Sequence, residues 1–228
     1  MDVPIARYID AAILYPELEQ TQAMEAVKSV IAYCCRTVCV RPCDIASAAE
    51  LCRNTKTGVC AVLGFPHGCG LSRVKEYEAR VYADMGVDEI DMVVNYGYIR
   101  SAAWDLVTED IRSVTGAAQT RSIVVKVILE TSELTVEQIK KATECAIEAG
   151  ADYVKTSTGF ARGGATVEAV QVMLDAAQGR IQVKASGGIR DFAQAQVYID
   201  MGAVRLGVGY TSLAAICDGD RPSASSNS

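Results

Sequence analysis

The sequence predicts one α/β domain, a (β/α)8 TIM barrel, from three observations. Eight short apolar runs alternate with helical stretches along nearly the whole chain, which is typical of parallel βα units. Helical stretches end in Gly86, Gly150 and Gly202 directly before such a run, and glycine suits the left-handed end of a helix. Polar residues follow the runs, where the active sites of barrels lie. An open doubly wound sheet is the alternative, because alternation alone does not show closure.

The expected strands are Ile9–Ile13, Thr37–Val40, Val59–Gly64, Glu89–Val94, Ile123–Leu129, Tyr153–Thr156, Gln182–Ala185 and Val204–Val208. The best-marked helix precedes Gly150. Thr135 and Gln138 have the spacing of a capping box, and apolar residues from Ile139 to Ala149 keep helical spacing. Equal offsets after the three glycines predict equivalent places for Asp91, Lys155 and Gly207 on their strands.

Residues 1–217 are expected to form the barrel, with a short N-terminal extension before the first strand and no internal linker. Residues 218–228 are polar and rich in serine, which predicts a disordered tail.

The composition limits the partners. Of the 228 residues, 50% are hydrophobic and 22% are charged, which allows a substantial core. The net charge of −6 argues against nucleic acid as the main partner. We expect no membrane span, because no run of about 20 apolar residues occurs. The first residues lack the basic and long apolar regions of a signal peptide. A cytoplasmic protein is therefore expected, and a homodimer is an assembly that the sequence leaves open.

The chain has nine cysteines, and six of them fall between Cys34 and Cys60. An odd number in a domain of this size predicts reduced thiols in a cytosolic protein. A zinc site is the sharper alternative, but no CxxC pair occurs and the only histidine is His67, in a loop by context. We expect neither a metal nor a cofactor.

Two lysines carry most of the functional information. Lys155 and Lys184 each end an apolar run and are followed by small hydroxyl residues and glycine. Lysine is a poor core residue unless it is paired or needed for chemistry. Two ammonium groups held close together lower each other's pKa, so one can be a neutral amine at pH 7 that forms a Schiff base with a carbonyl.

Other polar residues follow the expected strands and are further candidates. They are Asp10, Asp91, Asn95, Lys126 and Glu130. Any one of them could be a structural ion pair in the barrel mouth. Asp91 together with Lys155 and Lys184 is an expensive way to hold strands together, so this combination favours a chemical role.

Glycines after the last two strands predict a phosphate site. Gly187-Gly188-Ile189-Arg190 follows one of them and Gly207-Val208-Gly209 ends the other. Exposed backbone N–H groups bind anions, and phosphates commonly lie at this position in barrels. Glycine also serves ordinary tight turns, which is the plainer interpretation.

Several of these segments resemble the signature segments of the deoxyribose-phosphate aldolase family. The main ones are Glu89-Ile90-Asp91-Met92-Val93-Val94-Asn95, Val154-Lys155-Thr156-Ser157-Thr158-Gly159-Phe160 and Val183-Lys184-Ala185-Ser186-Gly187-Gly188-Ile189-Arg190. Gly163-Gly164-Ala165-Thr166, Gly64-Phe65-Pro66 and Lys126-Val127-Ile128-Leu129-Glu130-Thr131 are similar too. The likeness runs in order from about Ile9 to Leu213.

The resemblance implies a class I aldolase on a TIM barrel that needs no metal. Such an enzyme reversibly cleaves 2-deoxy-D-ribose 5-phosphate to acetaldehyde and D-glyceraldehyde 3-phosphate. It implies that Lys155 is the Schiff-base lysine, that Lys184 keeps it reactive and that Asp91 transfers protons through water. Asp10 and Lys126 match supporting positions. The implied phosphate-binding residues are Gly159, Gly187, Gly188, Arg190, Gly207 and Gly209.

The sequence departs from the family pattern at three places. Asp10-Ala11-Ala12 lacks the usual threonine, Gly209-Tyr210 replaces two serines, and the chain ends in Ser228 where some members have tyrosine. Two alternatives follow: a lysine-dependent barrel aldolase for a different sugar phosphate, and a weakened barrel that only binds one. Retention of Asp91, Lys155 and Lys184 argues against the second.

Overall fold

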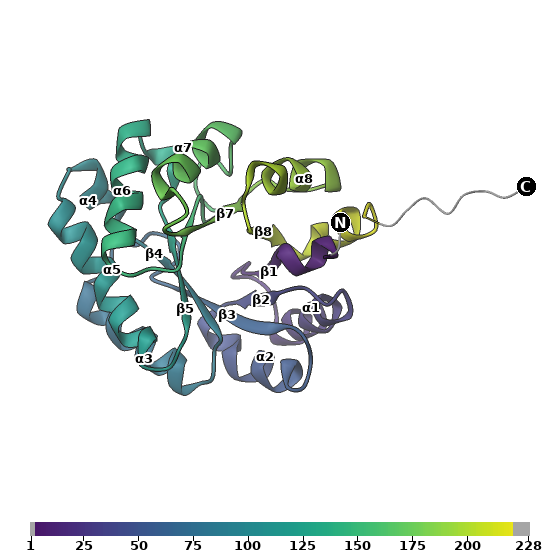
Figure 1. The fold of residues 1–228 in the computed structure, drawn as a ribbon. Helices are drawn as coiled ribbons and strands as arrows, with labels where there is room; N and C mark the ends of the chain where they lie inside the picture. Colours follow the sequence, from purple (N-terminus) through teal and green to yellow (C-terminus); the bar gives the residue numbers. More distant parts are fainter. Residues whose placement is uncertain (1–2, 221–228) are drawn as a thin grey trace, which may run out of the picture.

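The computed structural model describes residues 3–220, which form a closed barrel of parallel strands surrounded by helices (Figure 1). The strands are β1 (Ile9–Ile13), β2 (Thr37–Val40), β3 (Gly58–Leu63), β4 (Glu89–Val93), β5 (Val124–Ile128), β6 (Tyr153–Lys155), β7 (Gln182–Ser186) and β8 (Arg205–Gly209). Each expected strand is present; β1 and β2 have the expected bounds, and no end of the other strands differs by more than one residue. Because β8 pairs with β1, the predicted barrel is confirmed and the open sheet is excluded.

The helices follow the strands in alternation. They are α1 (Gln20–Ala32), α2 (Ile45–Cys52), α3 (Ser72–Asp84), α4 (Tyr96–Arg100), α5 (Trp104–Gln119), α6 (Val136–Glu148), α7 (Val167–Ala177), α8 (Phe192–Met201) and α9 (Leu213–Cys217). Four short 3-10 turns are η1 (Ile5–Tyr8), η2 (Pro42–Asp44), η3 (Thr131–Glu133) and η4 (Tyr210–Ser212). The predicted capping box of α6 is confirmed: Thr135 and Gln138 exchange hydrogen bonds of 3.0 and 3.3 Å.

Two different interiors result from strand alternation. Residues that face the helices, such as Ile9, Ala11 and Ile13 on β1, belong to one large apolar core between barrel and helices. The barrel interior holds charged residues, with a small apolar cluster of Leu14, Cys39, Cys60 and Val62 beside them. The chemistry is therefore placed inside the barrel, while stability comes mainly from the surrounding layer.

The strand register corrects one expectation. Lys155 is level with Lys184, and Lys184 is level with Arg205, so Gly207 lies further along its strand than Lys155 does. Asp91 is level with Lys126. Equal spacing from a glycine fails as a rule because strands in a barrel are staggered relative to one another.

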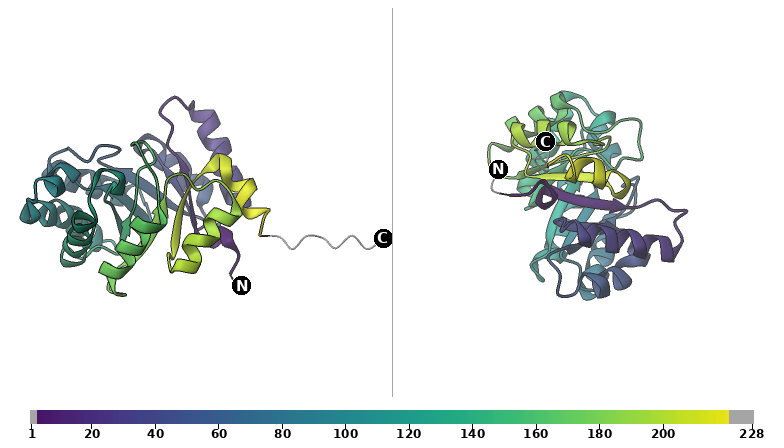
Figure 2. Two further views of the ribbon diagram at one scale, coloured as in Figure 1. Left: turned by 90° about the horizontal axis from the view of Figure 1, so that it is seen from above. Right: turned by 90° about the vertical axis from the view of Figure 1, so that its right-hand side faces the viewer.

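The two ends of the described chain lie side by side (Figure 2). The N–H of Ile5 donates to the Asp220 carboxylate at 3.0 Å. The first three residues of the predicted disordered tail, 218–220, thus form a turn against the N-terminal extension. The rest of that tail lies outside the described residues.

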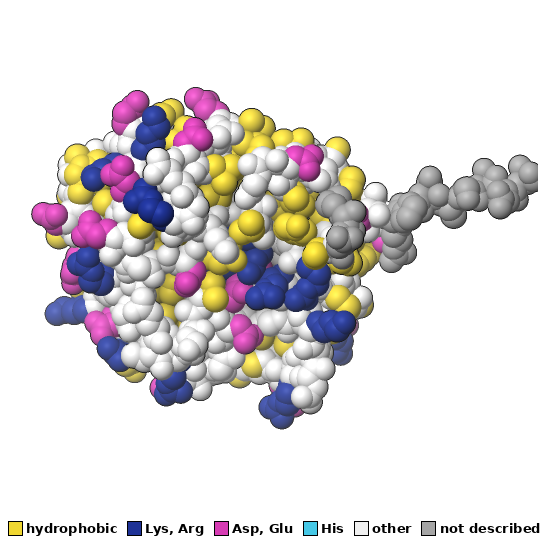
Figure 3. Space-filling model, viewed as in Figure 1, with side chains coloured by type: hydrophobic (Ala, Val, Ile, Leu, Met, Phe, Trp, Pro, Cys, Tyr) yellow, Lys and Arg dark blue, Asp and Glu magenta, His cyan; other side chains and the backbone are white. Residues whose placement is uncertain are grey.

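The surface carries both signs of charge. On the face in Figure 3, acidic and basic side chains are interspersed at the left, and a group of Lys and Arg side chains lies right of centre. In the described part of the chain, no helix is both long and apolar enough to cross a membrane.

Candidate active site

Charged side chains from six strands meet inside the barrel. They are Asp10 (β1), Glu89 and Asp91 (β4), Lys126 (β5), Lys155 (β6), Lys184 (β7) and Arg205 (β8). We call this set the charged cluster. Each member exposes 4% or less of its surface. Three carboxylates thus face four basic groups in the interior of the barrel.

Asp91 is the centre of the charged cluster. Its Oδ2 accepts hydrogen bonds from Nζ of Lys155 and of Lys184, both at 2.7 Å, and its Oδ1 accepts one from Lys126 at 2.7 Å. Burial alone would raise the pKa of Asp91, but the three ammonium groups outweigh it and hold the pKa well below the usual range. The Asp91 carboxylate is therefore shared by Lys155 and Lys184.

Asp10 supports Lys184 from the opposite side. Its Oδ2 accepts from Lys184 at 2.5 Å, and its Oδ1 accepts from Arg205 at 2.6 Å and from the Thr37 hydroxyl at 2.7 Å. Burial opposes ionisation, yet these cations and Lys126 lower the pKa of Asp10 below its usual value. Glu89 in turn contacts Lys126 at 2.6 Å and Arg205 at 2.8 Å.

The three lysines differ in how many carboxylates they contact. Lys126 contacts Glu89, Asp91 and Asp10, and Lys184 contacts Asp10 and Asp91. Burial would lower the pKa of both amines, but the carboxylates prevail and raise it. Both lysines therefore remain protonated at neutral pH. Lys155 has one ion-pair contact, to Asp91.

Lys155 also lines a cavity of about 140 Å³ at the carboxyl ends of the strands. The lining residues are Ala12, Leu14, Tyr15, Lys155, Thr158, Gly159, Phe160, Ser186, Gly187, Gly188, Ile189, Gly207, Val208 and Gly209. Lys126 and Lys184 lie deeper, outside this lining set. Of the three amines, that of Lys155 is the one that a small carbonyl compound reaches from the cavity.

The predicted phosphate residues gather in the same lining. Gly159, Gly187 and Gly188 have φ of 84°, 92° and 81°, a conformation that favours glycine. Gly207 is packed, since a Cβ there would lie 2.5 Å from Cβ of Ser186. Arg190 is exposed and lies just beyond the lining, so the structure does not place it with the glycines.

Two family departures lie in the wall of this cavity. Ala12 lines it with a methyl group where the family pattern has a hydroxyl. Gly209 lines it as well, and the nearest atom to an added Cβ is Thr211 Oγ1 at 3.9 Å.

Not every candidate joins the charged cluster, and two members were not predicted. Asn95 instead caps α4, where its side chain accepts from the N–H of Gly97. Glu89 and Arg205 were missed because each begins a strand, at the end opposite the cavity. A charged residue beside a buried apolar run was the signal that could have found them.

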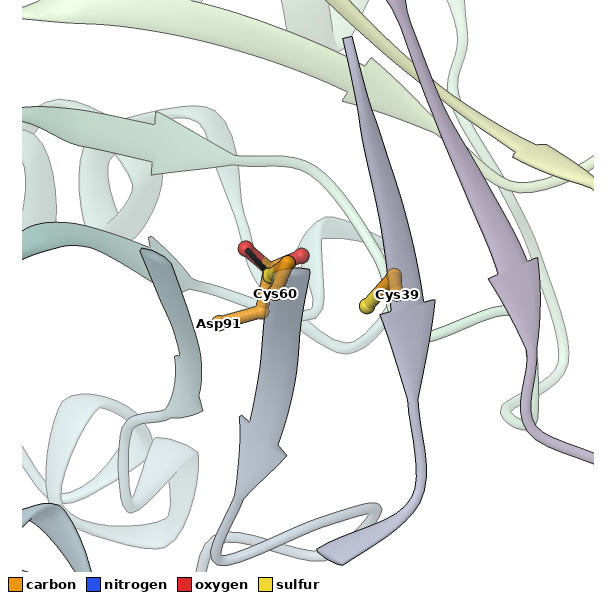
Figure 4. Close-up of side chains that lie close together, drawn as sticks. All are labelled: Cys39, Cys60 and Asp91. Atoms are coloured by element: carbon orange, nitrogen blue, oxygen red, sulfur yellow. Dashed lines mark hydrogen bonds between the residues drawn. The ribbon is translucent and has the colours of Figure 1, made fainter. Parts of the chain in front are cut away.

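One group of cysteine and carboxylate side chains converges closely within the described part of the chain. Sγ of Cys39, Sγ of Cys60 and a carboxylate oxygen of Asp91 lie within 4.8 Å of one another (Figure 4). Burial and the neighbouring Cys39 raise the pKa of Cys60 well above the usual value, so its thiol stays protonated. Asp91 also contacts three ammonium groups. This environment opposes binding of a metal cation, which needs thiolate and free carboxylate ligands.

The comparisons with known proteins give the family. The pattern of the DeoC/LacD family aldolases matches residues 6–218. The chain belongs to this aldolase family. A deoxyribose-phosphate aldolase of Exiguobacterium sp. is 46% identical over 89% of this chain and 91% of its own length. One from Clostridium perfringens is 40% identical over 94% and 95%.

Solved aldolase structures have the same fold. A protein titled QR15, an aldolase, has a TM-score of 0.88 and 41% identity, covering 94% of this chain and 95% of its own. A putative deoxyribose-phosphate aldolase from Coccidioides immitis has a TM-score of 0.91 and 36% identity, covering 96% and 86%. Membership of the aldolase family is therefore consistent with the barrel and with the signature segments that supply most of the charged cluster.

Proposed function

We propose that this aldolase reversibly cleaves 2-deoxy-D-ribose 5-phosphate to acetaldehyde and D-glyceraldehyde 3-phosphate through a Schiff base on Lys155. The single observation that carries the proposal is the position of Lys155. Lys155 is the last residue of a buried strand and lines the cavity, and its amine donates to the same oxygen of Asp91 as the amine of Lys184 does. Relatives that carry the name deoxyribose-phosphate aldolase over most of this chain support the substrate.

The charge balance of the cluster supports a reactive amine. Three carboxylates balance three of the four basic groups, so the cluster is neutral when one lysine loses its proton. Lys126 and Lys184 are each held by two or more carboxylates, and arginine does not lose its proton in proteins. Lys155 is the remaining group and the one that meets the cavity. It is therefore the amine placed to attack a carbonyl.

The reaction then follows from the geometry. The Lys155 nitrogen bonds to C1 of the open-chain sugar, and loss of water gives the protonated Schiff base. The C3 hydroxyl loses its proton, the C2–C3 bond breaks, and the electrons of that bond move into the C1–nitrogen system. The part of the sugar from C3 onward leaves as D-glyceraldehyde 3-phosphate. Protonation at C2 and hydrolysis release acetaldehyde. Asp91, beside the nitrogen, holds the water that carries these protons.

The glycines of the loops after β6 and β7 and those of β8 itself are suited to the phosphate. Gly159, Gly187, Gly188, Gly207 and Gly209 line the cavity and can present N–H groups. Arg190 is exposed just outside this lining, where its positive charge favours the approach of a phosphate. Phosphate binding by backbone groups accommodates the absence of the serines.

The weakened-barrel alternative is less consistent with the site. A barrel that only binds a sugar phosphate has no use for a buried cluster of seven charged groups, which is costly to desolvate. A different sugar phosphate as substrate remains the enzyme alternative. This alternative predicts that another sugar phosphate is cleaved with a higher kcat/KM than 2-deoxyribose 5-phosphate.

Trapping of the covalent intermediate tests the proposal. Acetaldehyde and borohydride should attach one ethyl group to Lys155, as located by mass mapping, and Lys155→Ala should abolish it. The matched control is Lys141→Ala, an exposed lysine on α6. An ethyl group found on Lys184 would make Lys184 the Schiff-base lysine instead. Loss of activity with a chelator, restored by a divalent metal, would reject the mechanism.

We also propose a cytoplasmic enzyme. The nine cysteines are not joined in disulfides, and a reducing compartment preserves cysteines in the thiol form. The homodimer stays a prediction, and one structural relative, from Aeropyrum pernix, is titled as a tetramer. Light scattering on the purified protein measures the assembly.

A further inference from the structure

Glu130 is a buried carboxylate that the mechanism does not use. It lies two residues after the end of β5 and directly before η3, and its exposed fraction is 1%. Its backbone has φ 58° and ψ 62°, the left-handed region that residues other than glycine adopt rarely. Strained backbone of this kind persists where the surroundings hold it in place.

The contacts of Glu130 go to the loop that follows Lys155. Its Oε2 accepts from the N–H of Thr158 at 3.2 Å and from the Thr158 hydroxyl at 2.5 Å. The same hydroxyl oxygen accepts from the N–H of Phe160 at 3.0 Å. These three hydrogen bonds connect one carboxylate oxygen of Glu130 to the turn formed by residues 158–160 and hold that turn in place.

A structural ion pair does not account for Glu130. Among the described residues, no basic group forms an ion pair with it, and its Oε1 is buried without a hydrogen-bond partner. Burial raises the pKa of the Glu130 carboxyl, against the lowering effect of the Thr158 hydrogen bonds and of the Lys155 charge. The fold therefore keeps a costly acceptor at this position for its contacts with Thr158.

The turn 158–160 is a wall of the catalytic cavity. Thr158, Gly159 and Phe160 line that cavity beside Lys155. Thr158 and Phe160 also line a neighbouring cavity of about 240 Å³, to which Glu130 contributes. Phe160 packs edge-on against Phe65, with ring centroids 5.2 Å apart. The position of one turn consequently sets the shape of the space next to the reactive amine.

We propose that Glu130 is a positioning residue that fixes the turn 158–160 and thereby sets the fit of the sugar-phosphate chain beyond the carbonyl carbon. The inference rests on the proposed function. Lys155 itself is held by its ion pair with Asp91 and by its strand, whereas the hydrogen bonds of Glu130 go to the wall of the cavity. A two-carbon aldehyde at Lys155 should not depend on the wall, whereas the five-carbon substrate should.

The test separates these two substrates. In Glu130→Ala, kcat/KM for 2-deoxyribose 5-phosphate should fall about 10- to 100-fold, mostly through KM, as expected for a displacement near 1 Å. Borohydride trapping of acetaldehyde at Lys155 should keep its wild-type rate. Glu130→Gln should recover most of the loss, because an amide oxygen still accepts from Thr158.

A second pair of variants tests the same contact from the other side and remains available if Glu130→Ala does not fold. Thr158→Val removes the hydroxyl and Thr158→Ser retains it, so only the valine variant should show the split between sugar and acetaldehyde. Thr158→Val should cause no further loss in the Glu130→Ala background. The control is Gln178→Ala, an exposed residue with a similar φ of 46° at the end of α7, which should leave both rates unchanged.

The outcomes are distinguishable. An equal loss of sugar cleavage and of acetaldehyde trapping would show general damage and overturn the inference. Glu130→Gln as poor as Glu130→Ala would show that the carboxyl acts through its proton or charge, which also overturns it. Failure of the wild-type protein to trap acetaldehyde at Lys155 would reject the proposed function itself.

Discussion

Lys155 and Lys184 are register partners on adjacent strands, yet their surroundings give them different tasks. Both amines donate to the same oxygen of Asp91, which brings two positive charges close together. Lys184 has a second carboxylate, Asp10, and its pKa is raised, so its charge is permanent at neutral pH. Lys184 therefore places a permanent positive charge beside the Lys155 amine.

Lys184→Met should lower activity at pH 7 and move the basic limb of Schiff-base formation to higher pH. The physical reason is that a like charge at about 5 Å and an effective dielectric near 20 is worth roughly 3 kcal/mol. The measurement is the rate of borohydride trapping against pH. Lower activity with an unchanged pH profile would assign Lys184 to direct proton transfer.

Asp91→Asn should cause a large fall in kcat with little change in KM. The amide keeps the shape of the side chain but removes the base, and the pKa of Asp91 is so low that the carboxylate is present at every working pH. Steady-state kinetics with 2-deoxyribose 5-phosphate measures both constants. Asn95→Ala is the control, since Asn95 only caps α4. A change confined to KM would count against proton transfer.

At the scale of elements, the loops after β7 and β8 supply backbone where the family pattern has side-chain hydroxyls. Gly187 and Gly188 need their positive φ, whereas Gly209 has φ −61°, which any residue adopts. Gly209 also has open space beside it, unlike Gly207. Substitutions of Gly207 and Gly209, which both lie in β8, should therefore have different effects on the same cavity.

Gly209→Ser should lower the KM for 2-deoxyribose 5-phosphate and leave unphosphorylated 2-deoxyribose nearly unaffected. A hydroxyl at this position can donate to the phosphate, and a hydrogen bond to a charged group is worth roughly 1.5–3 kcal/mol. The measurement is KM for both sugars. Equal effects on the two would show that position 209 does not contact the phosphate. Gly207→Ser, by contrast, should destabilise the barrel, because its Cβ meets Ser186.

At the scale of the whole molecule, the interior of the barrel is a network of charges inside an apolar shell. Removing one partner leaves an uncompensated buried charge, which is strongly destabilising. The network connects β1, β4, β5, β6, β7 and β8, so the strands that carry the charged cluster also depend on its ion pairs for their packing.

Stability should fall in acid because of Asp10 and Asp91. The folded pKa of each lies below its usual value of 3.8, so their contribution is present above about pH 4 and is lost as the pH falls toward the folded pKa. Glu130 acts in the opposite direction, since its raised pKa costs stability above its usual value of 4.5. Urea midpoints between pH 6 and pH 3 measure the sum.

Asp10→Asn provides the comparison for this acid profile. Its urea midpoint should be lower than that of the wild type at pH 6 and should change less below pH 4, because one of the two strongly perturbed carboxylates is gone. Lys141→Ala, which breaks an exposed pair with Glu144, should keep the wild-type profile. Parallel acid profiles for wild type and Asp10→Asn would show that Asp10 is not the source.

The sequence alone determined the alternation of strands and helices, the capping box at Thr135 and the place of Lys155 at the end of its strand, whereas Lys184 lies in the middle of β7. These features depend on local periodicity and on residues near in sequence, which a single chain displays directly. Closure of the barrel, the inclusion of Glu89 and Arg205 and the contact of Glu130 with Thr158 were decided only by the tertiary structure. Each joins strands or loops distant in sequence, and barrel stagger sets which side chains meet. The family resemblance implies that Lys155 is the Schiff-base lysine, while its position in the cavity lining and its single ion-pair contact, to Asp91, are features of the tertiary structure.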